Sequence, residues 1–493
     1  MSMIRLSDNT RYVKVDNLWF KYHDQSETKE KGFNLSNSLL NYFSVPVSEL
    51  RDSEDNSVLI YPNSFHDAID EVGKQIVFDI TKRDADGKPI EFWTKNTIGF
   101  ISHKGHEVSI GSRFSQGEED YFLYYMLARV CCINLLNLEF SSQGRKQGFN
   151  LMIFFLPKLL KEALGQGLFK QYIYSEYNDA KVRGPIDINR HLRRNIPFNG
   201  RVAYRTREFS FDNPITQLVR HAIELVKKTQ WGSKIMNSDE TAKSLIQQII
   251  SATPTYEERQ RQNIININLR PVIHPFYTAW QPLQDFCLRL LRQENLSYGT
   301  DKHNKVYGML IDVAWLWEEY LACVLAENTC FTHHTIDNAF HLFDKGEETF
   351  QKVIPDYLDA ENNLVADAKY IPLHRFDRMD AERAAAVYYK TIMYMYRFNA
   401  TKGFLFHPCN NDDIEYIKTK QLDERRPRLL HLNIDKNTIF ADYKIVDTKG
   451  FLYELGMIIP EAKDYEEFCE RMRTVENSFN NRIMEQTRQI TSV

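Results

Sequence analysis

Short apolar runs with the bulky, β-branched character of strands fill the first part of the chain. Glycine, asparagine and aspartate separate these runs and favour turns, so hairpins and a small sheet or barrel are expected. The clearest runs are residues 57–62, 74–83 and 90–114. From Glu118 to Gly165 the apolar positions take a helical spacing instead. The pattern predicts a β-rich N-terminal domain with a helical end, which we place at residues 1–170.

Helical patterns dominate the middle of the chain. Asn213 and Pro214 start one helix, because asparagine is a good helix cap and proline fits the first turn. A Ser-Asp pair followed by an acidic residue starts a second helix at Ser238. A third helical pattern spans residues 276–330. We assign residues 171–300 to a basic segment and a helical middle region.

The last part of the chain alternates strand and helix patterns. Two strand-like runs, Val353–Leu358 and Leu364–Ile371, flank the turn sequence Asp-Ala-Glu-Asn-Asn. A helix pattern at residues 379–401 and a strand pattern at residues 402–408 follow. We expect an α+β or α/β multidomain protein, in which residues 301–493 form an α/β domain.

Three charged residues of the two strand-like runs are expected to crowd one small volume. Alternate residues of a strand share a face, so Asp367 and Lys369 project together, while Ala366 and Ala368 point away. Asp356 then approaches Asp367 across the hairpin. Two carboxylates and an ammonium group would meet there.

The Asp-x-Lys pattern is weak evidence by itself, because surface strands and turns often pair Asp with Lys and the pattern recurs in this chain. A rival hairpin carries Asp435 ahead of Asp442 and Lys444. Its turn is tighter, and no helix and strand follow it in the same way. We therefore prefer the copy at Asp367, which Pro-Asp precedes across a turn and a helix–strand pair follows.

Composition and charge narrow the class of protein. The chain has 493 residues, a net charge of −4, 43% hydrophobic and 26% charged residues, as expected of a soluble protein with two or three domains. Its seven cysteines follow no disulfide or zinc pattern. The N-terminus lacks the apolar core of a signal peptide, so a cytoplasmic protein is expected.

The sequence contains no phosphate-binding loop, HExxH or GxSxG motif, which argues against nucleotide hydrolysis by this chain and against zinc- or serine-dependent hydrolysis.

Positive charge is concentrated in one stretch. Residues 181–207 contain eight lysine or arginine residues and a single acid, Asp187. Isoleucine, phenylalanine and tyrosine are interleaved with these charges, unlike in a solvated tail. The stretch predicts an ordered basic surface for phosphates or an acidic partner. A solvated face is the alternative.

The order helix, strand, turn, strand, helix, strand, with Pro-Asp and Asp-Ala-Lys at its centre, resembles the PD-(D/E)xK nuclease superfamily. More specifically, the chain resembles the McrC family, the nuclease subunit of McrBC restriction systems. The resemblance rests on the stretches WLWEEYLACVL, VIPDYLD, VADAKYI and YYKTIMYMYRFNATKGFLFHP. The stretch VRGPIDINRHLRRNIPFNG is similar to an Arg-Gly-x-Ile-Asp segment of the family. The resemblance implies a restriction-endonuclease-like PD-(D/E)xK nuclease domain at residues 301–493. The last part of this range would be a C-terminal extension of the domain.

The resemblance also implies the catalytic residues. Asp356 and Asp367 match the family's acidic residues and, with the backbone carbonyl of Ala368, offer the hard oxygen ligands that Mg²⁺ prefers. Lys369 would position a water molecule or stabilise developing negative charge. Glu318 matches the acid of the helix before the core and would complete the outer sphere of the metal.

Further contacts are expected outside this cluster. On the helix after Asp-Ala-Lys, many relatives carry glutamine and, four residues later, tyrosine; here the pair is Lys390 and Tyr394. Lys390 is either a phosphate contact or a solvated lysine. DNA or partner contacts are also expected from Arg183, Asp187, Arg190, Arg193, Arg194 and Arg207.

Finally, the resemblance implies partners. McrC proteins work with McrB, an AAA+ GTPase ring, so GTP would be bound by the partner and not by this chain. The N-terminal half and the basic segment would dock on that ring and stimulate GTP hydrolysis. The expected function is a Mg²⁺-dependent endonuclease subunit, present as two copies, that cuts modified double-stranded DNA. A complex that cuts an unmodified sequence, a non-catalytic activator of an AAA+ motor and a standalone repair nuclease are the alternatives.

Overall fold

The computed structural model describes most of the chain. The described residues are 4–22, 32–52, 56–62, 76–103, 106–115, 119–133, 151–229, 231–237, 239–298, 306–335, 339–346, 348–373, 381–421, 429 and 431–488. The chain forms two compact units, Met1–Leu151 with His303–Val493, and Met152–Lys302. The division into three consecutive domains stays a prediction.

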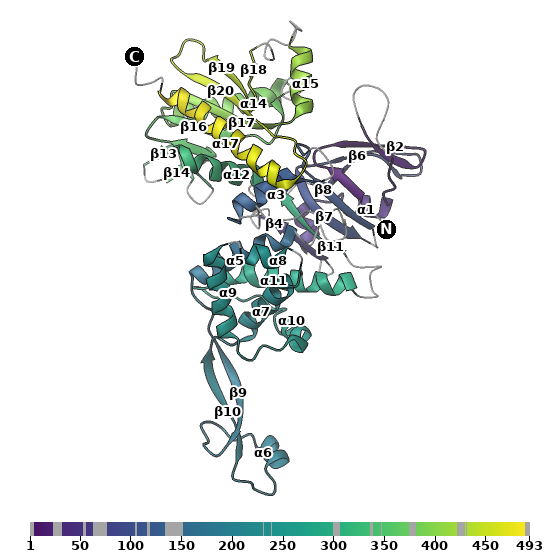
Figure 1. Ribbon diagram of the computed structural model, residues 1–493, viewed down its shortest axis with the longest axis vertical. Coiled ribbons are helices and arrows are strands. Elements are labelled where there is room, and N and C mark those ends of the chain that lie inside the picture. The colour runs from purple at the N-terminus through teal and green to yellow at the C-terminus, as the bar shows by residue number, and fades with distance from the viewer. Residues whose placement is uncertain are drawn as a thin grey trace. The chain divides into compact units, whose positions relative to one another are not determined.

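The first unit contains a five-stranded sheet in the order β1-β8-β7-β11-β4 (Figure 1). β11 comes from the later part of the chain, yet it pairs antiparallel with β7 and parallel with β4. The first and last parts of the chain therefore share one sheet. The strands are β1 (Ile4–Ser7), β4 (Asn56–Tyr61), β7 (Thr97–His103), β8 (His106–Gly111) and β11 (Val306–Asp312).

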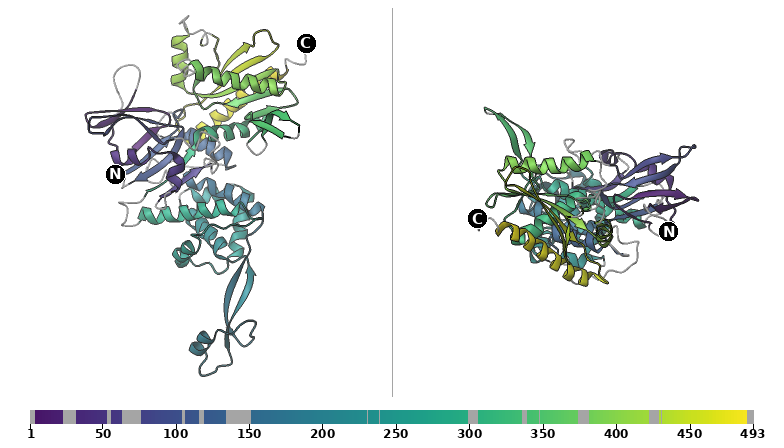
Figure 2. Two further views of the ribbon diagram at one scale, coloured as in Figure 1. Left: turned by 180° about the vertical axis from the view of Figure 1, so that it is seen from behind. Right: turned by 90° about the horizontal axis from the view of Figure 1, so that it is seen from above.

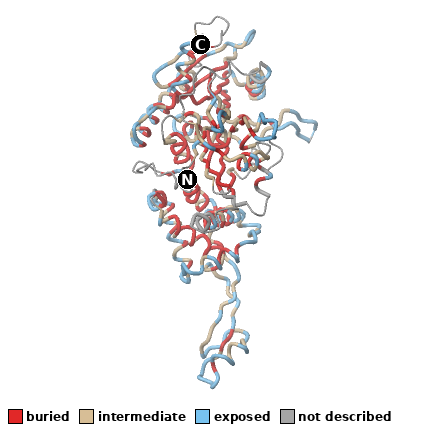
Figure 3. The backbone as a smooth tube through the Cα atoms, turned by 90° about the vertical axis from the view of Figure 1, so that its right-hand side faces the viewer, coloured by how far each residue is buried: buried red, intermediate tan, exposed pale blue. Residues whose placement is uncertain are grey.

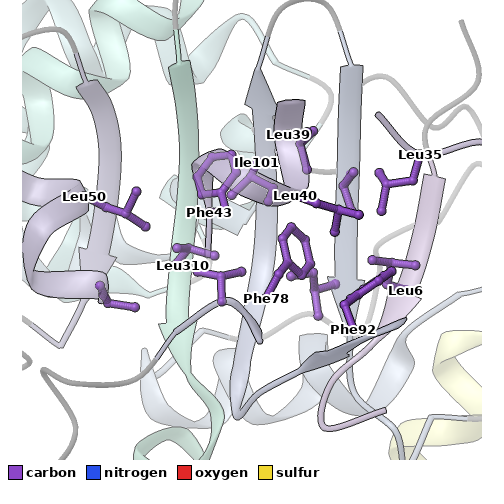
Figure 4. Packing of buried hydrophobic residues seen from close by; sticks show 14 of the residues in the cluster. Leu6, Leu35, Leu39, Leu40, Phe43, Leu50, Phe78, Phe92, Ile101 and Leu310 are labelled. Atoms are coloured by element: carbon purple, nitrogen blue, oxygen red, sulfur yellow. The ribbon is translucent and has the colours of Figure 1, made fainter. Parts of the chain in front are cut away.

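A four-stranded sheet in the order β3-β2-β6-β5 shares a hydrophobic core with the five-stranded sheet. Figure 4 shows Phe78 and Phe92 of this sheet packed near Leu310 of β11 and Phe43. Two short helices contribute to the same core and were not predicted from the sequence. The elements are β2 (Arg11–Val15), β3 (Leu18–Lys21), β5 (Phe78–Arg83), β6 (Pro89–Thr94), α1 (Asn37–Tyr42) and α2 (Val47–Asp52).

A seven-stranded sheet in the order β12-β15-β16-β17-β20-β19-β18 completes the strands of the first unit, together with the separate hairpin β13–β14. β16, β17 and β20 run parallel, as the helices between them allow. The strands are β12 (Thr332–His333), β13 (Phe340–Lys345), β14 (Glu348–Val353), β15 (Tyr357–Asp359), β16 (Leu364–Ala368), β17 (Lys402–Cys409), β18 (Asn433–Ile434), β19 (Thr438–Lys444) and β20 (Phe451–Ile458).

Helices cover both faces of the seven-stranded sheet. α14 packs on β16 and β17, whereas α17 packs on β20 and β19 and also contacts α12. α17 lies in front of the sheet in Figure 1, and α14 lies in front of it in the left view of Figure 2, which is seen from behind. α3 packs against α12. The helices are α3 (Tyr121–Val130), α12 (Val313–Asn328), α14 (Ala381–Arg397), α15 (Asn411–Lys420) and α17 (Tyr465–Arg488).

The second unit is a helical bundle from which a long hairpin projects. α7 lies at its centre, in contact with α8, α9, α10 and α11, and Figure 3 shows the buried residues gathered in the helices. The helices are α5 (Phe155–Gly165), α7 (Pro214–Lys227), α8 (Gly232–Met236), α9 (Glu240–Ala252), the 3-10 helix η3 (Glu258–Gln260), α10 (Arg261–Ile267) and α11 (Trp280–Tyr298).

The projecting hairpin, residues 171–210, is called the arm below. Its strands β9 (Gln171–Asp179) and β10 (Val202–Ser210) pair antiparallel along their whole length. Residues 180–201 between them form the tip, which contains α6 (Ile188–Arg194). In Figure 3 the arm is mostly exposed or intermediate.

The mixed α/β class and the β-rich N-terminal region are confirmed. The helix predicted across residues 276–330 is wrong at Val306–Asp312, which form β11, because a short apolar run reads alike in a buried strand and a buried helix. The sequence also did not predict α15. In the part of the chain that the structure describes, no helix combines the length and apolar character of a membrane span.

Candidate active site

A tight hairpin in the seven-stranded sheet carries the candidate catalytic residues. β15 and β16 pair antiparallel, with Asp359 opposite Leu364. The side chain of Asp359 closes the turn by accepting hydrogen bonds from the backbone N–H and the side-chain amide of Asn362, at 3.0 and 2.8 Å. Asn363 has a φ of 54°, which asparagine adopts more readily than most residues. The local turn sequence thus fixes the register of the two strands.

That register brings Asp356 and Asp367 together. Tyr357 lies opposite Ala366, so the residue before Tyr357 and the residue after Ala366 are neighbours at the open end of the hairpin. Oδ2 of Asp356 accepts a hydrogen bond of 2.6 Å from the backbone N–H of Ala368. Asp367 is fully buried and Asp356 is half-buried. The structure therefore places the two carboxyl groups in one small volume, and their catalytic role stays a prediction.

Two lysines approach the buried carboxyl group. Nζ of Lys369 pairs with Oδ2 of Asp367 and lies 3.4 Å from the carbonyl oxygen of Ala368. Nζ of Lys390, on α14, lies 3.5 Å from the other carboxylate oxygen, Oδ1. The Lys390 side chain is 46% exposed. Lys390 thus touches the cluster and remains accessible to a phosphate.

The two carboxyl groups differ in their affinity for protons. Burial raises the pKa of Asp356 well above its usual value, and the charges of Asp367 and Glu318 raise it further. Burial acts in the same direction on Asp367, but Lys369 and Lys390 outweigh it and lower the pKa of Asp367 to about 2. Asp367 is therefore the charged member of the pair, and Asp356 takes up a proton more readily.

Glu318 on α12 adds a third acidic group. Its Oε1 lies 2.8 Å from Nε2 of His333, a residue of β12. Its backbone carbonyl accepts a hydrogen bond of 2.5 Å from the hydroxyl of Tyr357, which ties α12 to β15. Burial lowers the pKa of His333, but the hydrogen bond with Glu318 raises it overall. His333 was not predicted from the sequence, because no motif around it marks it as a site residue.

The oxygen atoms at the open end of the hairpin fit a hard divalent cation. Carboxylates and backbone carbonyls are the ligands that Mg²⁺ prefers, and Asp356, Asp367 and Ala368 supply them. The repulsion that raises the pKa of Asp356 would be relieved by a cation. Among the described residues there is no group of three or more His, Cys, Asp or Glu side chains that could hold a metal ion. A metal at this hairpin would therefore depend on the carboxylates of Asp356 and Asp367 and the carbonyl oxygen of Ala368.

Tyr394, one helical turn after Lys390, supports the segment before Asp356. Its hydroxyl donates a hydrogen bond of 2.7 Å to the carbonyl oxygen of Ile354. The side chain is buried, and burial raises the pKa of its hydroxyl to about 12. Nζ of Lys390 lies 5.4 Å from the centre of the Tyr394 ring. Of this pair, Lys390 is the residue that a ligand can reach.

The rival hairpin is built differently. Asp435 is exposed and pairs with Arg482. Asp442 and Lys444 lie exposed on β19. In the register of β19 and β20, Asp442 lies opposite Tyr453 and not opposite a second acid. The rival aspartates are not brought into a buried cluster.

The basic segment forms the tip of the arm and most of β10. Asp187 caps α6 by accepting a hydrogen bond of 3.1 Å from the backbone N–H of Arg190, and its carboxylate lies 3.1 Å from Nε of Arg205. The Arg190 guanidinium donates to the carbonyl oxygens of Tyr177 and Tyr204, at 2.7 and 2.8 Å. Asp187 and Arg190 therefore hold the tip together.

The other arginines that are expected to contact DNA or a partner are exposed. Arg193 and Arg194 lie in the last turn of α6, and the guanidinium groups of Arg183 and Arg207 stack on tyrosine rings of β9. Large apolar side chains are exposed among them, which the sequence did not reveal. These are Val182, Ile186, Ile188, Leu192, Ile196 and Phe198. The tip thus combines positive charge with apolar contact surface.

Comparison with known proteins connects these features to one group of proteins. The family model described as McrBC 5-methylcytosine restriction system component matches residues 93–408. No curated protein matches the chain. Among solved structures, the chain is similar to a chain in a half-complex from the tetradecameric assembly of Thermococcus gammatolerans McrB AAA+ hexamers with bound McrC. The TM-score is 0.41 and the sequence identity is 14%, and the match covers 97% of this chain and 100% of that chain. It is also similar to a chain in the cryo-EM structure of the Thermococcus gammatolerans McrBC complex, with a TM-score of 0.28, 15% identity and coverage of 66% and 88%.

Proposed function

Because the chain belongs to the McrBC 5-methylcytosine restriction system component family, we propose that it is the nuclease subunit of a McrBC-type complex. In this proposal it is a Mg²⁺-dependent endonuclease that cuts modified double-stranded DNA when a GTPase partner is active. The observation that carries the proposal is the pair formed by the half-buried Asp356 and the fully buried Asp367, with Lys369 beside Asp367. A hairpin with a purely structural role has no need of two adjoining carboxyl groups that repel each other.

Each residue of the cluster has a role in phosphodiester hydrolysis. When bound, Mg²⁺ supplies Lewis-acid chemistry, polarising a phosphate oxygen and activating water. Asp356, Asp367 and the carbonyl of Ala368 would hold the ion. Lys369 orients the attacking water or stabilises the negative charge that develops on the phosphate. Glu318, oriented by its hydrogen bond with His333, would supply a further carboxylate to the outer sphere of the ion.

The proposed partner is an AAA+ GTPase of the McrB type, which binds the GTP. The sequence of this chain has no phosphate-binding loop, so the energy of nucleotide hydrolysis has to come from another protein. The arm suits docking, because exposed apolar and basic side chains lie together on its tip. Two copies of this chain in the working assembly would supply one active site for each DNA strand.

Lys369→Ala tests the proposal most directly. Plasmid cleavage is measured with Mg²⁺, a McrB-type partner and GTP, on cytosine-methylated and unmethylated DNA. We expect the variant to lose at least ~100-fold in cleavage of methylated DNA, because a group that stabilises the transition state is gone, and to keep its stimulation of GTP hydrolysis. The matched control is Lys444→Ala, since Lys444 ends another Asp-x-Lys stretch and is exposed; this variant should cut like the wild type.

The other outcomes separate the alternatives. Normal cleavage by Lys369→Ala would contradict the proposed active site. Faster GTP hydrolysis without cleavage of either DNA by the wild type would make the chain a non-catalytic activator of the motor. Cleavage of unmethylated DNA at one sequence would keep the nuclease and change its target.

A further inference from the structure

A loop of the five-stranded sheet grips the residue that follows Lys369. Ser112 and Arg113 come directly after β8, and Tyr370 comes directly after Lys369. The Arg113 guanidinium donates a hydrogen bond to the carbonyl oxygen of Tyr370, across 257 residues of sequence. The hydroxyl groups of Ser112 and Tyr370 share a hydrogen bond of 2.7 Å. The backbone and the far end of the Tyr370 side chain are thus both held by one loop.

Arg113 is itself held firmly. Its backbone N–H donates a hydrogen bond of 2.6 Å to Oδ1 of Asp8, and its Nη1 lies 3.3 Å from Oδ2 of the same carboxylate. The side chain of Asp8 is fully buried and that of Arg113 is 7% exposed. The Arg113 carbonyl accepts a hydrogen bond of 3.3 Å from the side-chain amide of Asn410, which caps α15. A buried ion pair of this kind keeps its geometry, because loss of one partner leaves an uncompensated charge.

Aromatic contacts place the Tyr370 ring. The Arg113 guanidinium carbon lies 4.8 Å from the ring centre, and Phe114 meets the ring edge-on with 4.9 Å between centroids. The ring of Trp317, the neighbour of Glu318 on α12, lies 6.4 Å away. Tyr370 is therefore packed between the loop after β8 and the helix that carries Glu318.

The backbone of Lys369 is restrained on both sides. Its N–H donates a hydrogen bond of 2.8 Å to the carbonyl oxygen of Phe406 in β17, and the carbonyl of the next residue is bound by Arg113. The Lys369 side chain reaches Asp367, whereas the carbonyl group and the hydroxyl of Tyr370 enter the loop contact. A displacement of Tyr370 would move the Lys369 ammonium group away from Asp367.

We propose that Arg113 is a positioning residue: by holding the carbonyl group and ring of Tyr370, it fixes Lys369 at the candidate active site. This inference rests on the nuclease function proposed above. In this inference, the loop after β8 of the five-stranded sheet affects catalysis through its contact with Tyr370. Because a misplacement of about 1 Å in a catalytic group costs on the order of 100-fold in rate, loss of this hold should be visible in cleavage.

Arg113→Lys tests the inference. Lysine keeps a positive charge for Asp8, but its single ammonium group lacks the planar fork that reaches Asp8 and the Tyr370 carbonyl together. We expect the cleavage rate at saturating DNA to fall about 10- to 100-fold, with the Kd for DNA and the stimulation of GTP hydrolysis unchanged. Hydrogen–deuterium exchange should speed up in peptides that cover residues 364–373, a measurement that needs no catalysis.

Two further variants make the test specific. Arg11→Lys is the matched control, because Arg11 also pairs with a nearly buried carboxylate, Glu91, at 2.7 Å in the N-terminal part of the chain. It should leave both cleavage and exchange at residues 364–373 as in the wild type. Tyr370→Phe removes only the bond to Ser112 and keeps the Arg113 contact, so it should lose less activity than Arg113→Lys.

The outcomes distinguish this inference from the nuclease proposal. Wild-type cleavage and exchange in Arg113→Lys would overturn the positioning role and leave the nuclease standing. A wild-type chain that cuts no DNA would overturn the nuclease, and exchange would still decide whether Arg113 holds Lys369. If Arg113→Lys does not fold, Asp8→Asn loosens Arg113 instead, and unchanged cleavage and exchange there would count against the inference.

Discussion

Asp367 keeps its negative charge in a fully buried position because an ammonium group lies beside each of its carboxylate oxygens. Burial by itself would raise the pKa of Asp367, and Lys369 and Lys390 reverse that effect. In the family to which the chain belongs, many members carry glutamine at the position of Lys390, and glutamine donates hydrogen bonds without a charge. Lys390 therefore adds a second positive charge beside Asp367, and it stabilises the charged hairpin without the cation that the proposed function requires.

Another buried residue, His221 on α7, predicts a pH dependence of stability in the second unit. The residue is 1% exposed, and its ring centroid lies 4.7 Å from that of Tyr256. Burial, helped by the positive charge of Arg261, lowers the pKa of His221 from 6.5 to about 4. The unfolded chain thus takes up a proton on His221 at a higher pH than the folded unit does. Burial of the neutral His221 ring therefore leaves the folded unit at full stability above about pH 6.5, and the free energy of unfolding decreases progressively as the pH falls towards 4.

His221→Phe keeps a ring against Tyr256 and removes the titrating group. Between about pH 7 and pH 4, we expect the thermal unfolding temperature of this variant to fall less than that of the wild type. The difference is the part of the pH dependence that comes from protonation of His221. Differential scanning calorimetry over this range measures the difference. Parallel pH profiles for the two proteins would show that the buried histidine does not carry the dependence.

Among the elements, the candidate hairpin could be predicted from the sequence because its signals are local. The turn residues from Asp359 to Asn363 and the alternating residue pattern around Asp367 lie within one short stretch of sequence. They determine the register in which β15 and β16 pair. β11 could not be predicted in this way, because its partners β4 and β7 lie far earlier in the chain. His333 and Arg113 were missed for the same reason, since their contacts with Glu318 and Tyr370 depend on which elements meet.

Gly308→Ala tests how closely β11 has to lie against β7. A Cβ at Gly308 would lie 2.4 Å from the carbonyl oxygen of Phe100, a backbone atom of the paired strand. We expect a loss of about 1–3 kcal/mol in the free energy of unfolding, as for other overpacked sites. Cleavage should also fall, because β11 leads directly into α12 and so places Glu318.

Gly165→Ala is the control for this substitution. Nothing lies within 4 Å of an added Cβ at Gly165, the last residue of α5, so stability and cleavage should stay near those of the wild type. Chemical denaturation of both variants gives the comparison. Equal stability of the Gly308 and Gly165 variants would mean that β11 and β7 can separate at little cost.

In the whole molecule, the two units hold the two features on which the proposed function depends. The first unit contains the hairpin with Asp356 and Asp367, and the second contains the arm. The positive charge of the arm is visible in the sequence, but the exposure of apolar side chains on its tip is not, because an isoleucine or phenylalanine in a sequence is more often buried. Exposed apolar side chains next to arginines favour a protein surface as the ligand of the tip.

Replacement of the tip, residues 180–201, by Asn-Gly should separate partner stimulation from folding. Asp179 and Val202 are paired at the ends of β9 and β10, and a two-residue Asn-Gly turn can join strands in this register. We expect stimulation of GTP hydrolysis to be lost, while the thermal unfolding midpoint and the exchange at residues 364–373 stay as in the wild type. Stimulation that survives in the tipless chain would move partner docking to another part of the chain.

Two smaller changes decide which chemistry the tip uses. Arg193→Glu with Arg194→Glu reverses charge and leaves the apolar side chains, whereas Phe198→Ser removes an apolar side chain that is 69% exposed and leaves the charge. If the tip binds DNA phosphates, the charge variant loses more, and wild-type DNA affinity falls steeply with salt. If it packs on a protein, Phe198→Ser loses more GTP stimulation and added salt has less effect. The second outcome is expected, because Asp187 and Arg190 hold the tip together internally and so keep its apolar side chains in place for a shaped surface.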